Sequence, residues 1–226
     1  MTDTMERKKD SLSVYGFIPV LWKSGKVKTR KYLYALWIFI IAICVVISLW
    51  FVFGRYYQAK EYELTEEVLR YRPVVEKYAK EYEIEEYVPY LLAIMQVESA
   101  GIGEDVMQCS ESLGLEPNSL EAEESIDQGC RYFSELLQIA AQNSCDMDTV
   151  IQAYNYGIGY LYYIAENGNR HTPDLAEQFA KNYSNNKKVE YNNPIAVKKN
   201  GGWRYGYGNM FYTLLVGQYV TQENHG

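Results

Sequence analysis

The sequence predicts an all-α domain that is preceded by a single membrane-spanning helix. One observation is an uncharged apolar run near the N-terminus, and the other is the recurrence of apolar residues at helical spacing in later segments. No alternating strand pattern of any length accompanies them. The chain has 226 residues, enough for one domain of ordinary size and an appendage, and its 48% hydrophobic content excludes a chain that is disordered throughout.

The apolar run covers Tyr32–Gly54 and contains no charged residue. A helix of roughly 20 apolar residues crosses a bilayer, so this run is long enough to span a membrane. A cleaved signal peptide is the alternative, but its apolar core is usually only about 7–15 residues and ends at small residues that are missing here. Ile43 before Cys44 is too bulky for a lipoprotein cleavage site. We therefore expect an uncleaved signal anchor over residues 32–54, with aromatic residues near both ends (Tyr32, Tyr34, Trp37, Trp50, Tyr56 and Tyr57).

The charge of the chain differs on the two sides of this run. Residues 1–53 hold eight Lys or Arg against three acids, a net charge of +5. Of the 22 basic and 29 acidic residues in total, 14 and 26 remain beyond residue 53, a net charge of −12. The positive-inside rule then predicts a single-pass cell-membrane protein with a basic cytoplasmic tail, residues 1–31, and an extracellular domain. The acidic remainder argues against direct nucleic-acid binding.

The other elements are predicted to be helices joined by loops. Residues 55–67 form a charged stalk, and Pro73 begins a helix because proline suits a first helical turn. Apolar helical spacing continues in five later segments, and two glycines interrupt the third of them. These segments are residues 90–98, 121–138, 148–163 (interrupted at 155–159), 174–183 and 209–220, with an Asn-, Gly- and Lys-rich loop at 184–208 and a tail at 221–226.

One of these helices ends in a lone carboxylate. The eight residues Tyr90–Val97 carry no charge, Glu98 follows them, and Gly101 suits a left-handed helix C-cap. Glu98 would then lie beside packed hydrocarbon at the negative end of the helix dipole, and both effects raise the pKa of a carboxylic acid. An acid that stays protonated near neutral pH can protonate a leaving sugar oxygen. The alternative is an ordinary helix-end glutamate that points into water.

Three short motifs follow one another in an informative order. They are Gln96-Val97-Glu98-Ser99-Ala100-Gly101, Asp105-Val106-Met107-Gln108 and Ala153-Tyr154-Asn155-Tyr156-Gly157, with supporting residues in 107–112, 125–126 and 205–209. This order resembles the lysozyme-like superfamily of goose-type lysozymes and lytic transglycosylases, and in particular its membrane-anchored CwlT-like domains from Gram-positive bacteria and their conjugative elements. The resemblance covers about residues 68–220. Val106, Tyr156 and Ile158 depart modestly from the residues usual in the family.

The resemblance implies an α-helical domain with a cleft that binds the glycan strand of peptidoglycan, so that the domain would face the cell wall. It implies cleavage of the β-1,4 bond between N-acetylmuramic acid (MurNAc) and N-acetylglucosamine (GlcNAc), with Glu98 as the general acid. Gln108 corresponds to a residue that lines the cleft, and Tyr154 and Asn155 correspond to residues that contact the glutamate and the sugar. Local opening of the wall for a conjugation machine, whose components would be partners, is the use that the resemblance suggests.

The outcome of the reaction stays open at this point. An inverting hydrolase needs a second carboxylate roughly 6.5–9.5 Å from the first, and Asp105 and Glu111 are the candidates. Their alternative roles are a turn or cap residue and an exposed loop acid. A lytic transglycosylase needs no second carboxylate, since the sugar's own hydroxyl attacks and an anhydro product forms. Hydrolysis is favoured because the CwlT-like members resemble muramidases, and an inactive glycan-binding module and an assembly scaffold are the non-enzymatic alternatives.

Aromatic and polar side chains are expected to line the cleft, because sugar rings bury their C–H faces on aromatic surfaces. The candidates are Tyr154, Tyr156, Tyr205 and Tyr207, together with Ser110 from a polar, glycine-bounded loop. Neither a metal nor another cofactor is predicted, because His171 and His225 stand apart without a cluster of ligands. A disulfide between Cys109 and Cys130 would suit an oxidising surface and leave Cys145 over, but the spacing does not fix the connectivity.

Overall fold

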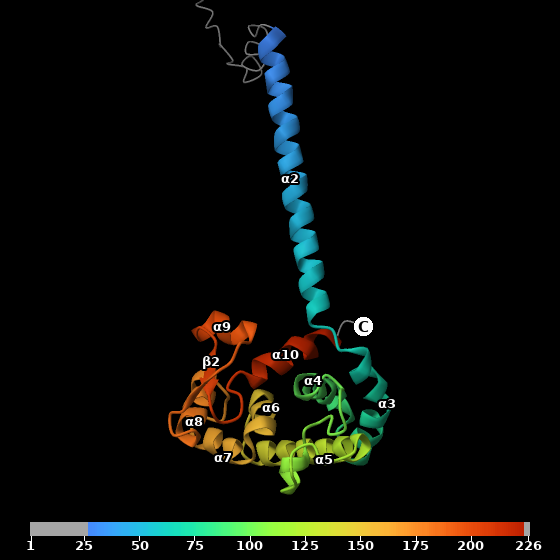
Figure 1. The fold of residues 1–226 in the computed structure, drawn as a ribbon, viewed down its shortest axis with the longest axis vertical. Coiled ribbons are helices and arrows are strands. Elements are labelled where there is room, and N and C mark those ends of the chain that lie inside the picture. The colour runs from blue at the N-terminus through green and yellow to red at the C-terminus, as the bar shows by residue number, and fades with distance from the viewer. Residues whose placement is uncertain (1–26, 224–226) are drawn as a thin grey trace, which may run out of the picture. The chain divides into compact units, whose positions relative to one another are not determined.

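The computed structural model describes residues 27–223, with side chains described for 32–55 and 62–220 (Figure 1). The chain divides into two units, residues 1–60 and 61–226. The first unit contains α2 (Val27–Glu61), in which Tyr32–Arg55 has no buried residue and includes an 18-residue stretch with a mean hydropathy of 2.9. By length and composition this segment could cross a membrane, which confirms the predicted apolar helix. The predicted tails at 1–31 and 221–226 fall mostly outside the described residues.

The second unit is built almost entirely from helices, which confirms the predicted fold class. A single short hairpin supplies the strands found in the described part of the chain. The elements are α3 (Glu66–Glu81), α4 (Val88–Glu98), α5 (Ala122–Gln142), α6 (Met147–Tyr156), α7 (Gly159–Glu166), α8 (Pro173–Tyr183), β1 (Lys188–Glu190), α9 (Pro194–Asn200), β2 (Trp203–Tyr205) and α10 (Tyr212–Glu223), with 3-10 turns at Glu85–Tyr87 and Ser110–Leu113.

The start of α3 differs from the sequence prediction. The helix begins at Glu66, so Pro73 lies inside it rather than at its first turn. Thr65 caps the helix, because its Oγ1 accepts a hydrogen bond of 3.3 Å from the N–H of Val68. A stripe of buried residues then continues past the proline to Ala79, and this packing offsets the missing backbone hydrogen bond.

The predicted loop at 184–208 also contains regular structure. β1 and β2 pair antiparallel, with Val189 opposite Arg204, and α9 lies between them in sequence. Strands of only three residues are too short to produce an alternating pattern, which explains why the sequence did not reveal them. The interruption predicted at residues 155–159 is confirmed, since α6 ends at Tyr156 and α7 begins at Gly159.

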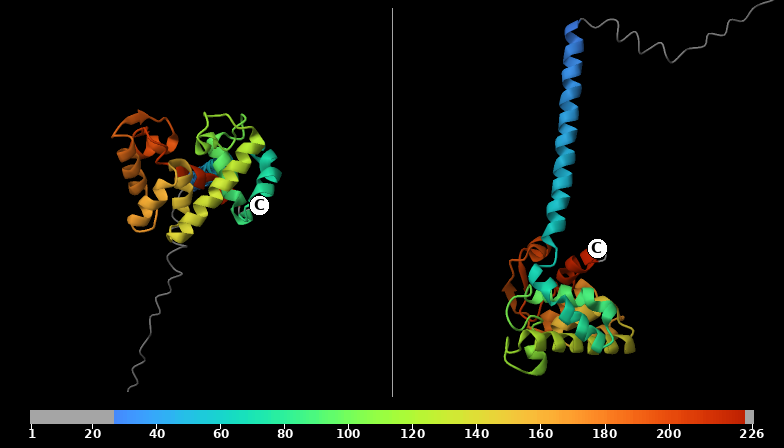
Figure 2. Two further views of the ribbon diagram at one scale, coloured as in Figure 1. Left: turned by 90° about the horizontal axis from the view of Figure 1, so that it is seen from below. Right: turned by 90° about the vertical axis from the view of Figure 1, so that its right-hand side faces the viewer.

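The helices form two groups that are linked by α5 and α6. In the first group, α4 contacts both α3 and α10, and Leu91–Met95 are completely buried. The second group consists of α7, α8, α9 and the hairpin, and Figure 2 (left) shows the two groups side by side. Since α5 contacts α3 and α6, and α6 contacts α7 and α10, these two helices fix the groups relative to each other.

Candidate active site

Glu98 is the last residue of α4 and follows the buried apolar run of that helix. Its side chain is half-buried. The pKa of Glu98 is raised to about 7, mainly by burial, with a hydrogen bond from Tyr212 lowering it and the negative charge of Asp105 raising it. Glu98 is therefore a carboxylic acid that keeps a substantial protonated fraction at neutral pH, as the sequence predicts.

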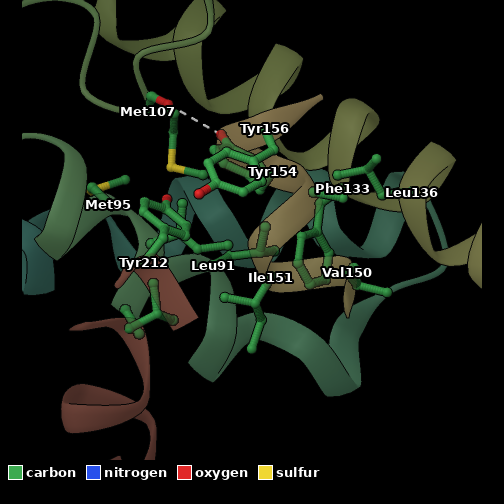
Figure 3. Packing of buried hydrophobic residues seen from close by; sticks show 14 of the residues in the cluster. Leu91, Met95, Met107, Phe133, Leu136, Val150, Ile151, Tyr154, Tyr156 and Tyr212 are labelled. Atoms are coloured by element: carbon green, nitrogen blue, oxygen red, sulfur yellow. Dashed lines mark hydrogen bonds between the residues drawn. The ribbon is translucent and has the colours of Figure 1, made fainter. Parts of the chain in front are cut away.

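Tyr212 contacts Glu98 from the first turn of α10, a contact that the sequence does not predict. The Tyr212 hydroxyl donates a hydrogen bond of 2.5 Å to Glu98 Oε1. Burial raises the pKa of Tyr212 well above its usual value, so the phenol remains the proton donor. The tyrosine is only 1% exposed and lies within an apolar helix pattern, where the sequence marks it as a core residue (Figure 3).

Residues of α6 hold the turn that precedes Tyr212. Asn155 Oδ1 accepts a hydrogen bond of 2.6 Å from the N–H of Asn209, and Gln152 Nε2 donates one of 2.9 Å to the Asn209 carbonyl. Gly208 lies against the same side chains with a φ of +45°, and a Cβ built on it would lie 2.7 Å from Asn155 Oδ1 and 2.6 Å from Tyr156 Cδ1. The α6 motif therefore places the start of α10 beside α4.

The segment that follows Glu98 is anchored by its own polar groups. Ser99 Oγ donates a hydrogen bond of 2.7 Å to the Val106 carbonyl and accepts one of 3.0 Å from the N–H of Gly101. Gly101 has a φ of +73°, and a Cβ there would lie 2.7 Å from the backbone nitrogen of Val68. Only glycine fits this close approach to α3, so the turn after Glu98 is rigidly placed.

Asp105 is buried, and its carboxylate organises the loop after Glu98. The carboxylate accepts four hydrogen bonds, from the N–H groups of Cys109 (2.9 Å) and Ser110 (3.1 Å) and from the hydroxyls of Ser110 (2.5 Å) and Ser125 (2.6 Å). Burial by itself would raise the pKa of Asp105, but these hydrogen bonds lower it below 3.8. Asp105 is therefore an ionised carboxylate whose four acceptor positions are all occupied.

Gln108 lies at the surface of this loop, next to Met107, whose backbone is held in place by two hydrogen bonds. The Met107 N–H donates a hydrogen bond of 2.8 Å to Ser125 Oγ. The Met107 carbonyl accepts a hydrogen bond of 3.1 Å from the Tyr154 hydroxyl (Figure 3). Gln108 adopts a left-handed φ of +50°, and its Nε2 donates to the Asp105 carbonyl at 2.9 Å and to Asn118 Oδ1 at 2.7 Å. The exposed amide is thereby oriented by the loop rather than left free to rotate.

The structure divides the predicted site residues into partly exposed and buried sets. Glu98 and Asn155 are half-buried, whereas Gln108 and Glu111 are exposed. Tyr207 is also half-buried, and its hydroxyl donates 2.9 Å to the Tyr156 carbonyl. The other predicted residues are buried parts of the framework, at 1–9% exposure: Asp105, Ser110, Tyr154, Tyr156 and Tyr205.

Three cysteines of the second unit are free in the structure. The proposed pairing of Cys109 with Cys130 is therefore not formed, although both are buried. Burial raises the pKa of each of these two thiols to about 12, which makes them poor nucleophiles. Within the described residues, no group of three His, Cys, Asp or Glu side chains could hold a metal ion.

A glutamic acid that burial keeps partly protonated is the kind of general acid that lysozyme uses. Residues 65–220 match the family model described as lysozyme-like, and the chain belongs to this family. It is 34% identical over 156 residues to the uncharacterized membrane protein YocA of Bacillus subtilis, an alignment that covers 67% of both chains.

Two further relatives are longer proteins. Over 125 residues the chain is 38% identical to the bifunctional muramidase/DL-endopeptidase CwlT of Bacillus subtilis. This alignment covers 54% of this chain and 37% of CwlT. A solved Staphylococcus aureus structure, described as similar to a lipoprotein of the NLP/P60 family, is 61% identical with a TM-score of 0.69, covering 70% of this chain and 54% of that chain. The match thus spans about half or less of these two relatives.

Proposed function

We propose that this protein is a cell-wall lytic enzyme that cleaves the β-1,4 bond between MurNAc and GlcNAc, with Glu98 as the general acid. The observation that carries the proposal is the raised pKa of Glu98, about 7, at a half-buried position on the domain's core helix. A glycosidase needs a protonated carboxylic acid to protonate the leaving oxygen. The family membership and the muramidase activity named for the CwlT relative support a peptidoglycan substrate.

Gln108 and Asn155 are the proposed glycan-binding side chains near Glu98. The Asn155 carbonyl oxygen holds the Asn209 N–H, which leaves the amide nitrogen as a donor without an acceptor among the described residues. Gln108 uses its amide nitrogen on the loop and Asn118, which leaves its carbonyl oxygen as an acceptor. The two side chains thus offer one donor group and one acceptor to sugar hydroxyls or acetamido groups.

The reaction has one of two outcomes, which differ in whether a second carboxylate acts as a base. If a base activates water, the products are reducing muropeptides, and Glu111 is the remaining candidate because it is exposed. The four hydrogen bonds on Asp105 favour the alternative, since a carboxylate with no open acceptor position is a poor base. If no carboxylate activates water, the chain is a lytic transglycosylase that forms anhydro-MurNAc ends.

Mass spectrometry of the digestion products tests this choice. The full chain, solubilised in detergent, is incubated with purified peptidoglycan beside the Glu111→Gln variant. Reducing products that disappear in Glu111→Gln support hydrolysis with Glu111 as base, whereas anhydro products that persist in it support transglycosylation. If the wild-type chain binds glycan strands but releases no product, the domain is an inactive glycan-binding module and the proposal fails.

We further propose that α2 anchors the chain in the cell membrane with its N-terminus in the cytoplasm and the lysozyme-like domain facing the wall. The unburied apolar segment Tyr32–Arg55 and the similarity to a membrane protein support anchoring. Proteolysis of intact protoplasts tests the orientation, since external protease should remove the domain and spare the N-terminus. Local wall opening for a conjugation machine stays a prediction, and co-purification of transfer components with the chain tests it.

A further inference from the structure

The lysozyme-like domain has a sharply divided charge. Residues 65–180 hold six basic and 22 acidic side chains, a net charge of −16. Residues 181–208, which we call the basic segment, hold six basic side chains and one acid, a net charge of +5. The basic segment contains the hairpin and α9, so a compact part of the fold opposes the charge of the rest.

The lysines of the basic segment are exposed, and they have no carboxylate partners among the described residues. The ion pairs found among the described residues lie elsewhere, on α3 and between α3 and α5. The exposed side chains are those of Lys181, Lys187, Lys188, Lys198 and Lys199. Their charges are therefore uncompensated locally, and they create a positive field on one part of an acidic protein.

Aromatic rings fix part of this surface in place. Lys188 Nζ lies 3.4 Å from the centroid of the Trp203 ring, and the guanidinium of Arg204 lies 5.5 Å from that of Tyr191. These cation–π contacts hold the charges near the hairpin instead of letting them swing through solvent. A pre-positioned cation loses less conformational freedom when it binds an anion.

The basic segment is also continuous with the candidate active site. Arg204 donates hydrogen bonds to the carbonyls of Tyr205 and Gly208, and Gly208 lies against Asn155. The next residue, Asn209, begins the turn that leads to Tyr212. A polymer that is bound at Glu98 and Asn155 therefore has the basic segment as an immediate neighbour.

We infer that the basic segment binds the carboxylates of the peptide stems that peptidoglycan glycan strands carry. The inference rests on the proposed function, because it assigns this surface to the same strand that Glu98 cleaves. Lys198 and Lys199, which make no cation–π contact with the described residues, suit such a ligand, since they are flexible, hydrated point charges that tolerate variation in stem length and position. The acidic remainder of the domain repels the same carboxylates, which directs the stems toward the basic segment.

The test measures binding to insoluble wall, using the full chain in detergent with Glu98→Gln to prevent digestion. The wall is first stripped of phosphate polymers, and half of it is treated with carbodiimide and ammonia to convert carboxylates to neutral amides. The test variant is Lys198→Gln with Lys199→Gln on α9. Its control is Lys77→Gln with Lys80→Gln on α3, which removes the same charge from exposed positions outside the basic segment.

We expect the α9 variant to bind the carboxylate-bearing wall about three- to tenfold more weakly than its parent and to bind the amidated wall equally well. The difference should shrink at high salt, because exposed charges are screened. Equal binding of both chains to both walls, or equal weakening on both walls, would overturn the inference. A parallel assay with unstripped wall completes the test, and an effect confined to that wall would also overturn the inference.

Digestion by the chain with native Glu98 separates this inference from the proposed function. If that chain cleaves both walls and the lysine substitutions change neither binding nor cleavage, the stem-binding inference fails while the enzymatic function stands. If that chain cleaves neither wall but the lysine-dependent binding persists, the proposed cleavage fails and the binding surface stands.

Discussion

The Tyr212 hydroxyl donates a hydrogen bond of 2.5 Å to Glu98 Oε1, which joins two residues 114 positions apart in sequence. Tyr212 belongs to α10 and Glu98 to α4, and these two helices are in contact. The relationship makes the pKa of the candidate acid depend on the packing of the C-terminal helix. A carboxylate that accepts a hydrogen bond is stabilised in its charged form, so Tyr212 holds the pKa of Glu98 below the value that burial alone would produce.

Replacing Tyr212 with phenylalanine should raise the pKa of Glu98 above its value of about 7. The ring fills the same buried space, so the fold is kept while the hydrogen bond is lost. The alkaline limb of kcat/KM should move upward by about one pH unit, the value of a hydrogen bond to a charged group. A pH–rate profile on purified peptidoglycan measures the limb, and an unchanged limb would show that Tyr212 does not set the pKa of Glu98.

Glu98 should also make the stability of the domain depend on pH. Its folded pKa of about 7 lies above the ordinary value of 4.5, so the folded state binds more protons between these two values. The stability that this proton contributes is fully present below pH 4.5 and is lost as the pH rises through 7. Glu98→Gln removes this dependence, so its thermal midpoint relative to wild type should increase from pH 4.5 to pH 7.

Thermal unfolding of both chains at pH 4.5, 6 and 8 measures this difference. A constant difference between the chains would contradict the raised pKa. Glu104→Gln is a matched control, because it makes the same chemical change at an exposed position of the following loop.

Asp105→Asn should destabilise the domain by about 2–4 kcal/mol, because an amide cannot accept all four hydrogen bonds that the buried carboxylate accepts. The pKa of Asp105 is lowered, so its contribution is present above about pH 3.8 and is lost as the pH falls through its folded pKa. Denaturant unfolding at pH 7 measures the loss.

The same substitution removes a negative charge that raises the pKa of Glu98. The alkaline limb of activity should therefore move to lower pH, opposite to the effect of Tyr212→Phe. As a control, Asp174→Asn changes an exposed carboxylate in the first turn of α8 and should cost no more than about 1 kcal/mol. Wild-type stability in Asp105→Asn would contradict the organising role of this carboxylate.

The sequence predicted the features of the site that depend on local burial, but not those that depend on contacts between distant helices. An uncharged helix that ends in one glutamate predicts both the core position of α4 and the raised pKa of Glu98, because both depend on local burial. Tyr212 depends on a contact between distant helices, and a tyrosine in an apolar pattern gives no sign of its hydrogen-bond partner. Tyr154 and Tyr156 were expected to contact sugar, but backbone carbonyls bind their hydroxyls inside the domain.

The helix α3 and the hairpin show the same limit for the fold. A proline normally marks a helix boundary, but the buried stripe that includes Val68 and Val75 continues through Pro73 because tertiary packing outweighs the local preference. The hairpin depends on pairing between Val189 and Arg204, and a strand of three residues is too short for its sequence to predict this pairing. Long periodic segments were therefore predictable, and features fixed by distant contacts were not.

Gly208→Ala should destabilise the turn before Tyr212. Its φ of +45° disfavours a side chain, and a Cβ would lie 2.6 Å from Tyr156 Cδ1 and 2.7 Å from Asn155 Oδ1. We expect a loss of about 2 kcal/mol or more in the free energy of unfolding, with lower activity because the turn positions Tyr212. The control is Gly217→Ala in α10, where a Cβ meets no atom of the described residues within 4 Å and helix propensity should add up to about 1 kcal/mol. Equal effects of the two substitutions would contradict this account of the turn.

The most direct test of the central claim is the release of muropeptides from purified peptidoglycan by the full chain and by Glu98→Gln, measured by mass spectrometry. Glutamine fills the same volume but cannot donate a proton to the leaving oxygen. We therefore expect wild type and Glu104→Gln to release products, and Glu98→Gln to remain folded and release at least about 100-fold less. Product release by Glu98→Gln at the wild-type rate would contradict the assignment of Glu98 as the general acid.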